Sequence, residues 1–173
     1  MSEDHAARAI QTPRLRLRRA VAGDLDALHT MMSDAETMRF WSTPPHPDRE
    51  TTARWLDSMI AAPAATSDDF IVELDGLAIG KLGAWRWPEV GFLFSRDCWG
   101  LGYASEALAA FVAYAFATGL DHLTADVDPR NSSCLALLTR HGFHETGRAA
   151  RTWLVGETWC DSVYLRLDRP GSA

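Results

Sequence analysis

The chain has 173 residues, of which 47% are hydrophobic and 23% are charged. This length and composition suit one compact domain with its own core and argue against a long disordered protein. Lys and Arg number 17 against 23 Asp and Glu, a formal charge of −6, which argues against a general nucleic-acid binder. We therefore expect a single domain over residues 1–173, frayed at 1–9 and 169–173, and no nucleic-acid partner.

The N-terminal part of the chain predicts one strand followed by two helices. Residues 14–20, "RLRLRRA", alternate apolar and charged side chains, as in a strand with one buried face. Leu15 and Leu17 should point inward, and the arginines should form a solvated face: Arg14, Arg16, Arg18 and Arg19. Apolar residues at helical spacing then predict helices over 23–32 and 46–60, separated by an aromatic and proline-rich loop.

The rest of the chain mixes strands and helices. Residues 69–95 form three β-rich runs, the first two joined by the hairpin signal Asp75-Gly76. Further elements are then predicted: a helix ending near 119, a strand at 122–128, a helix over 131–141, and two strands around 150–155 and 159–167. The order βααβββαβαββ predicts a mixed α/β (α+β) domain.

The three cysteines, Cys98, Cys134 and Cys160, are odd in number and lack C-x-x-C or Cys/His ligand spacing. They indicate neither a disulfide framework nor a metal site, so we expect no metal. No run approaches the roughly 20 apolar residues that span a bilayer, and the N-terminus has no signal-peptide core. The sequence predicts a cytoplasmic protein without a membrane partner.

Residues 99–116, "WGLGYASEALAAFVAYAF", place two glycines directly before a helical pattern. A helix N-terminus carries unpaired N–H groups and about half a positive charge. Gly100 and Gly102 leave this backbone open to an anion such as a phosphate, although the pattern also occurs in plain strand-to-helix turns. A Rossmann-like nucleotide site is a weaker alternative, because its third glycine is replaced by Ser105, although Asp126 lies near the expected place of a ribose-binding acid.

Four ordered stretches resemble the GCN5-related N-acetyltransferase (GNAT) family, and more narrowly its RimJ/RimL-type branch. They are "TPRLRLRRAVAGDLDAL", "EVGFLFSRDCWGLGYASEAL", "NSSCLALLTRHGF" and "CDSVYLRL", and the match covers about residues 11–168. The resemblance implies a mostly antiparallel central sheet with a splayed pair of strands, flanked by helices. It also implies an acetyl-coenzyme A-dependent N-acetyltransferase.

The same resemblance implies how acetyl-coenzyme A binds. Main-chain amides of the glycine turn would hold the pyrophosphate, and the splayed strand would pair with the pantetheine arm as a ligand adds to a sheet edge. Phe94 N–H would donate to the thioester oxygen, and Trp99, where many relatives carry Arg or Gln, would cover the turn. The implied cofactor-binding residues are Phe92, Leu93, Phe94, Trp99, Gly100, Leu101, Gly102, Tyr103, Ala104, Asn131 and Cys134.

Direct attack by an amine needs a base for its proton and a proton for the departing thiolate. Glu89, at the start of the strand that carries Phe92 and Phe94, matches an acid of the branch and is the expected base; otherwise it is an exposed strand-end acid. Cys134 stands where the family's N-x-x-S element has Ser. A thiol with an ordinary pKa of about 8.5 can act as the acid, although Cys134 can equally be a small buried side chain.

Other acidic and hydroxyl groups are weaker candidates. Tyr103 on the loop is an alternative proton donor, and Glu106 in the first turn of the helix is expected to be structural, because it complements the helix dipole. Asp128, Glu145 and Glu157 lie near predicted strand ends, and the sequence does not rank them.

The resemblance places the acceptor between the loop that joins the first two helices and the strands. Trp41, Trp85 and Trp87 are the expected substrate-binding residues, with Met38, Phe40, His46, Arg151, Trp153 and Trp159 as further candidates. The expected partner is an amine-bearing acceptor, on a protein N-terminus, an amino acid or a small molecule, and the acidic balance favours a cationic one. The alternative is a catalytically inactive acyl-coenzyme A-binding regulatory module. A homodimer is common in the branch.

Overall fold

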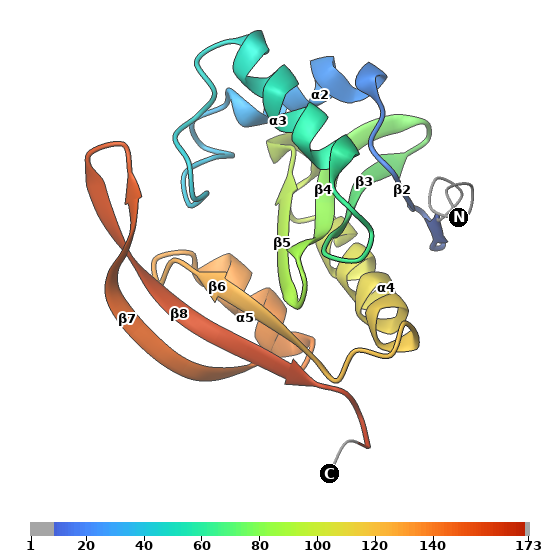
Figure 1. Cartoon of the computed structure of the whole chain (residues 1–173), viewed down its shortest axis with the longest axis vertical. Coiled ribbons are helices and arrows are strands. Elements are labelled where there is room, and N and C mark those ends of the chain that lie inside the picture. The colour runs from blue at the N-terminus through green and yellow to red at the C-terminus, as the bar shows by residue number, and fades with distance from the viewer. Residues whose placement is uncertain (1–8, 172–173) are drawn as a thin grey trace.

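The structure is a computed structural model that describes residues 9–171. The frayed ends expected from the sequence therefore lie partly outside the described residues, at 1–8 and 172–173. An eight-stranded sheet forms the centre, in the order β1-β2-β3-β4-β5-β6-β8-β7 (Figure 1). Its strands are β1 Ile10–Gln11, β2 Arg16–Arg18, β3 Asp68–Leu74, β4 Leu77–Arg86, β5 Glu89–Phe94, β6 His122–Val127, β7 His144–Val155 and β8 Thr158–Asp168.

Four α-helices and two short 3-10 turns complete the fold. The helices are α2 Leu25–Met32, α3 Arg49–Ala61, α4 Tyr103–Ala117 and α5 Ser132–Arg140, and the turns are η1 Ala22–Asp24 and η2 Arg96–Cys98. Apart from the added strand β1, the order βααβββαβαββ is the predicted one. The Asp75-Gly76 hairpin is also confirmed, because both residues have the positive φ that a tight hairpin turn requires.

The predicted strand at 14–20 is shorter in the structure. The chain turns at Thr12, whose N–H donates to the carbonyl of Leu15, and only residues 16–18 form β2. Leu15 and Leu17 are buried as expected. The expectation of a solvated arginine face is wrong for Arg18 and Arg19, whose side chains are only 18% and 17% exposed. The Arg18 guanidinium pairs with Asp24 and with Glu73, and Arg19 pairs with Asp68.

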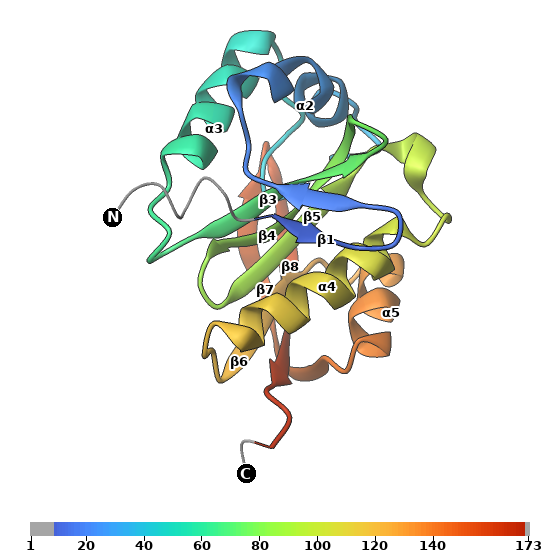
Figure 2. The same ribbon diagram turned by 90° about the vertical axis from the view of Figure 1, so that its right-hand side faces the viewer.

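Two apolar clusters hold the sheet between its helices. Along β3, Phe70 joins the cluster under α4 and α5, whereas its neighbour Ile71 joins the cluster under α2 and α3. Successive strand residues point to opposite faces, so the two helix pairs cover opposite faces of the sheet (Figure 2). Each large apolar side chain buried here, such as Phe111, stabilises the fold by roughly 1.5–3 kcal/mol.

The sheet opens in the middle, between β5 and β6. These strands are parallel and pair at a single position, Glu89 with Thr124, whereas the other neighbouring strands are antiparallel. Beyond Glu89 the two strands diverge (Figure 1), so the edge of β5 from 91 to 94 has no strand partner on the β6 side. The splayed pair implied by the resemblance is confirmed.

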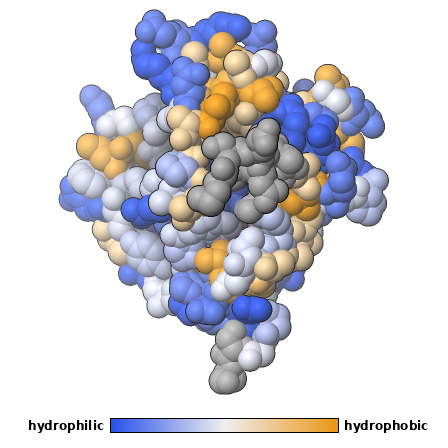
Figure 3. All heavy atoms as spheres, turned by 45° about the vertical axis from the view of Figure 1, so that its right-hand side comes forward, coloured by the Kyte–Doolittle hydropathy of each residue, from blue (hydrophilic) through white to orange (hydrophobic). Residues whose placement is uncertain are grey.

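The surface carries no single dominant apolar area on the face seen in Figure 3, where hydrophobic side chains of the described residues form separate patches among hydrophilic ones. Within residues 9–171, no helix has the length and apolar character needed to cross a membrane. The same part of the chain holds no group of three or more His, Cys, Asp or Glu placed to bind a metal ion.

Candidate active site

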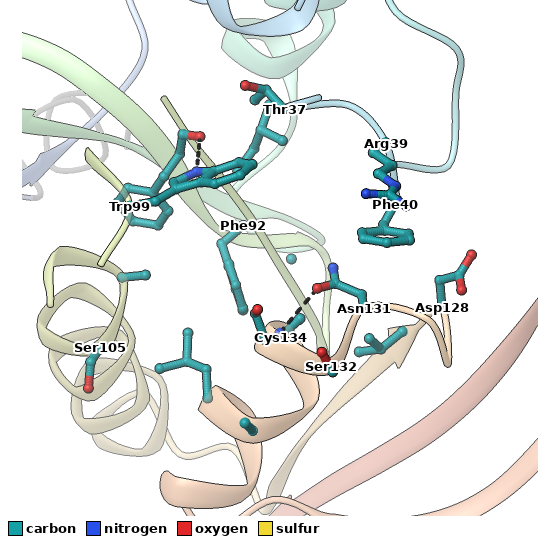
Figure 4. Close-up of a pocket in the computed structure, with 18 of the residues that line it drawn as sticks. Thr37, Arg39, Phe40, Phe92, Trp99, Ser105, Asp128, Asn131, Ser132 and Cys134 are labelled. Carbon is teal, nitrogen blue, oxygen red and sulfur yellow. Dashed lines mark hydrogen bonds between the residues drawn. The ribbon is translucent and has the colours of Figure 1, made fainter. Parts of the chain in front are cut away.

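A cavity of about 1170 Å³ lies where β5 and β6 diverge (Figure 4). It exceeds the roughly 300–1,000 Å³ of most small-molecule pockets, which suits a long ligand. It is bounded by β5, by the turn before α4, by the first turn of α4 and by α5. All the predicted cofactor residues except Leu101 line it: Phe92, Leu93, Phe94, Trp99, Gly100, Gly102, Tyr103, Ala104, Asn131 and Cys134.

The glycine turn has the geometry that its sequence predicts. Gly100 and Gly102 have φ values of 74° and 82°, in the left-handed region that favours glycine. A Cβ added at Gly100 would meet nothing within 4 Å, so the backbone there is open. Gly102 is the N-cap of α4 and provides no side-chain cap, which leaves the first-turn N–H groups of α4 to an anion.

Hydrogen bonds from the N-terminal segment hold the glycine turn in place. Glu106 accepts hydrogen bonds from the Thr12 hydroxyl at 2.6 Å and from Arg14 Nε at 2.6 Å. Arg14 Nη1 in turn donates to the carbonyl of Leu101 at 3.0 Å. Glu106 therefore orders the loop, consistent with its expected structural role. Sequence patterns missed Arg14, because its partner is 92 residues away.

Trp99 connects the turn to the strand. Its indole Nε1 donates to the Phe94 carbonyl at 2.9 Å (Figure 4). The ring is 47% exposed. This bond therefore connects the end of β5 to the turn and uses one lone pair of the Phe94 carbonyl.

On the opposite wall, α5 positions the candidate acid. Asn131 is the N-cap of α5, and its Oδ1 accepts from Cys134 N–H at 3.2 Å. Figure 4 shows Phe92 and Cys134 near the middle of the cavity, with Trp99 on one side and Phe40 on the other. Burial raises the pKa of the Cys134 thiol to about 12. At neutral pH this side chain is therefore a protonated donor and a poor nucleophile.

A polar contact not predicted from the sequence joins the two helices of this cavity. Ser105 Oγ, in the first turn of α4, lies 2.8 Å from His141 Nε2 at the end of α5. Burial, followed by the charge of Arg140, lowers the pKa of His141 below its ordinary value. The imidazole is therefore neutral at pH 7, and the pair presents polar atoms beside the turn.

A second cavity, of about 400 Å³, adjoins the first. The two share the residues Arg39, Phe40, Trp41, Gly91, Asp126 and Asp128. The predicted Trp41, Trp85 and Glu89 line this second cavity, and so does Trp153. We call it the acceptor cavity, and we call the larger one the cofactor cavity.

Several other residues expected near the acceptor lie elsewhere. Trp87 stacks on Phe111 with centroids 5.8 Å apart, so it packs in the core and lines neither cavity. Met38 and His46 are buried outside both cavities. Arg151 and Trp159 form an exposed pair on the β7–β8 hairpin, with the guanidinium 5.3 Å from the ring centroid.

The geometry also separates the candidate bases. Glu89 lies at the point where β5 and β6 diverge, and Trp85 Nε1 donates to its Oε1 at 3.1 Å. The Asp128 side chain is paired with Arg130 Nη2 at 2.5 Å, and this hydrogen bond lowers the pKa of Asp128. Glu145 pairs with Arg148 and lines neither cavity, and neither does Glu157.

The cofactor cavity, open strand edge and glycine turn define an acyl-coenzyme A-binding fold, and comparisons with known proteins agree. The family model described as "Acetyltransferase (GNAT) domain" matches residues 14–144. The uncharacterized N-acetyltransferase p20 of Bacillus licheniformis is 27% identical over 148 residues, which cover 80% of this chain and 83% of that protein.

Solved structures share the fold. A GNAT-family acetyltransferase from Bacillus anthracis superposes with a TM-score of 0.81 and 24% identity, covering 93% of this chain and 98% of that one. The Salmonella typhimurium acetyltransferase described as modifying the N-terminal serine of ribosomal protein L7/L12 has a TM-score of 0.83 and 16% identity, covering 94% of this chain and 99% of that one. RimL in complex with coenzyme A has a TM-score of 0.82 and 16% identity, covering 93% and 98%.

This chain belongs to the GNAT acetyltransferase family, since the family model spans most of its length. It is an acetyl-coenzyme A-dependent acyltransferase. The residues present fit that co-substrate, because open main-chain groups on β5 and at the start of α4 face one long cavity.

Proposed function

We propose that the chain transfers the acetyl group of acetyl-coenzyme A directly to a primary amine. The observation that carries this proposal is the junction of the two cavities at Gly91, between Glu89 and Phe92 on β5. A thioester held along the free edge of β5 would end at this junction. An amine in the acceptor cavity would then face the thioester carbonyl without crossing any secondary-structure element.

Candidate groups are present for the proton of the attacking amine, the thioester oxygen and the departing sulfur. Glu89 takes the proton of the attacking ammonium, directly or through water, because it lines the acceptor cavity beside the junction. Phe94 N–H donates to the thioester oxygen as it gains negative charge. Cys134 donates a hydrogen bond to the departing sulfur, because its thiol stays protonated at neutral pH; its raised pKa of about 12 opposes complete proton transfer, contrary to the expectation from an ordinary thiol.

The RimL structure supports the place of the thiol. In that complex coenzyme A forms a disulfide with a cysteine of RimL, so a cysteine in this fold can reach the coenzyme sulfur. Cys134 lines the corresponding cavity here. The fold likeness to RimL also supports the RimJ/RimL-type branch. We place the protein in the cytoplasm as a homodimer, and three free cysteines suit a reducing compartment.

The test combines binding and turnover. Acetyl-coenzyme A should raise the melting temperature of the protein, whereas NAD should not. Release of free coenzyme A thiol should then follow on adding amines from a panel of small amines, amino acids and peptide N-termini. Binding of acetyl-coenzyme A without thiol release for any of these amines would overturn the proposal and favour the inactive regulatory module.

A further inference from the structure

The acceptor cavity carries more negative than positive charge. Five carboxylates line it, namely Asp69, Glu89, Asp126, Asp128 and Asp161, against the two cations Arg39 and Lys81. Both cations are already paired, Lys81 with Asp69 at 2.6 Å and Arg39 with Glu36 at 3.4 Å. Asp128 pairs with Arg130. Among the described residues, Glu89, Asp126 and Asp161 therefore have no ion-pair partner.

These three carboxylates are nevertheless held in place, by neutral donors. Trp85 Nε1 donates to Glu89, Trp153 Nε1 donates to Asp126 Oδ2 at 2.9 Å, and the main-chain N–H of Arg151 donates to Asp161 Oδ1 at 2.9 Å. A neutral donor orients a carboxylate without cancelling its charge. Glu89 and Asp126 therefore keep lone pairs that a cationic ligand can use. Asp161 lies three residues from Tyr164, the β8 partner of Asp126, so its side chain is on the opposite face of that strand.

One carboxylate oxygen in the same cavity has no hydrogen-bond partner among the described residues. Asp69 is only 6% exposed, and it lines the cavity beside Lys81. Its Oδ2 accepts from Lys81, but its Oδ1 is buried without a hydrogen-bond partner. Buried polar atoms of this kind are few in native proteins, and a site that a ligand completes is one physical reason for them.

The remaining walls are aromatic. Trp41 and Trp55 face the ammonium of Lys81 with ring centroids 5.4 and 6.0 Å from its Nζ, and Phe40, Trp85 and Trp153 also line the cavity. Aromatic faces attract cations and pack well against methylene groups. A free amino acid is a poorer fit, since its carboxylate would need a cation that is not already paired.

We propose that the acceptor is a small diamine or polyamine, with a second ammonium bound by Asp126. This inference rests on the proposed acetyl transfer. One ammonium gives a proton to Glu89, and the resulting amine forms the C–N bond to the acetyl carbon while the thioester C–S bond breaks. The nitrogen loses a second proton as the amide forms, and coenzyme A leaves as the thiol after gaining one, so one proton is released overall. The second amine keeps its proton and anchors the chain.

The first experiment uses three acceptors with the same four-carbon chain: putrescine, n-butylamine and γ-aminobutyrate. The kcat/KM of putrescine should exceed that of n-butylamine by about tenfold or more, which corresponds to about 1.4 kcal/mol. γ-Aminobutyrate should be the slowest, because it brings a carboxylate into a negative cavity. Equal rates for the three acceptors, or faster turnover of a peptide N-terminus than of putrescine, would overturn the inference.

The second experiment removes the Asp126 carboxylate. Asp126→Asn should lower the ratio of kcat/KM for putrescine to that for n-butylamine towards one, mainly through KM for putrescine. Asp57→Asn, which removes an exposed charge on α3 outside both cavities, should leave the ratio unchanged. A ratio insensitive to Asp126→Asn would contradict the inference.

A binding readout independent of turnover completes the test. Calorimetric titration of putrescine into the protein saturated with coenzyme A should give a Kd about tenfold weaker for Asp126→Asn than for the wild type, provided that both melt at similar temperatures. An unchanged Kd would count against the second ammonium site. Failure of every amine to release thiol would overturn the proposed transfer itself, whereas release without a preference for diamines would overturn only the inference.

Discussion

The two cavities are built in different ways. The cofactor cavity is formed mainly by two stretches of chain, one from β5 through the glycine turn to α4 and the other from β6 to the end of α5, and the first stretch offers much main chain. The acceptor cavity takes residues from seven of the strands and helices and from the loop between α2 and α3. A site made of main-chain groups keeps its hydrogen bonds when side chains are substituted, so it suits a ligand that stays the same. A side-chain site can change its ligand through single substitutions.

The largest effect is expected for Glu89→Gln, which removes the proposed base from the acceptor cavity and leaves the glycine turn of the cofactor cavity unchanged. We expect kcat to fall about 100-fold, a typical effect of losing a general base, with KM for acetyl-coenzyme A almost unchanged. The defect should shrink as pH rises towards the pKa of the acceptor amine, because the amine then loses its proton without help.

Glu157→Gln is the matched control, since Glu157 is exposed in the turn between β7 and β8 and lines neither cavity. A Glu89→Gln defect of less than about threefold, constant across pH, would exclude Glu89 as the base.

Gly100→Val tests the main-chain groups of the glycine turn in the cofactor cavity. A β-branched residue at a φ of 74° costs at least about 1–2 kcal/mol, so we expect KM for acetyl-coenzyme A to rise about tenfold. Gly76→Val is a close control, because Gly76 has a φ of 82° and an equally open Cβ position, far along the chain in the β3–β4 hairpin. Equal rises in KM for both variants would show that the turn has no special role.

Cys134→Ala tests a side chain of the cofactor cavity, where the other proposed contacts to coenzyme A come from main-chain groups. Loss of one hydrogen bond to the departing sulfur, worth about 1 kcal/mol, should lower kcat about fivefold, and Cys134→Ser should restore much of it. Cys98→Ser is the control, since Cys98 lines the same cavity and burial also raises the pKa of its thiol. An unchanged kcat in Cys134→Ala would mean that this cysteine only packs.

Glu106→Gln should give the smallest effect, a loss of about 1 kcal/mol in the free energy of unfolding at neutral pH. Partial burial alone would raise the pKa of Glu106, but hydrogen bonds from Thr12 and Arg14 outweigh it and lower the pKa below the ordinary 4.5. A lowered pKa means stability that is present above the ordinary value and lost as pH falls through the folded value.

The difference between wild type and Glu106→Gln should therefore vanish in acid, which denaturant titrations at several pH values would measure. Glu50→Gln, in an exposed pair with Arg54, should cost less. A larger cost in Glu50→Gln would mean that the Glu106 network adds nothing beyond a surface ion pair.

How far the sequence predicted the site depends on the distance along the chain between interacting residues. Gly100, Gly102 and the helix after them were predictable, because one turn and its helix obey local backbone rules. The partners of Glu106 and Ser105 were not, because Arg14 and His141 are 92 and 36 residues away. Trp87 was misplaced because it lies in the turn between β4 and β5, and only the packed structure shows that its ring stacks on Phe111.

The sequence by itself determined the order of strands and helices, the hairpin at Asp75-Gly76 and the anion-binding turn, because periodicity and glycine conformation are local properties. Only the tertiary structure decided which carboxylates face the acceptor and which are already neutralised. Charge pairing depends on distances between side chains from β3, β4, β6, β8 and the loops, and those distances exist only once the sheet has formed.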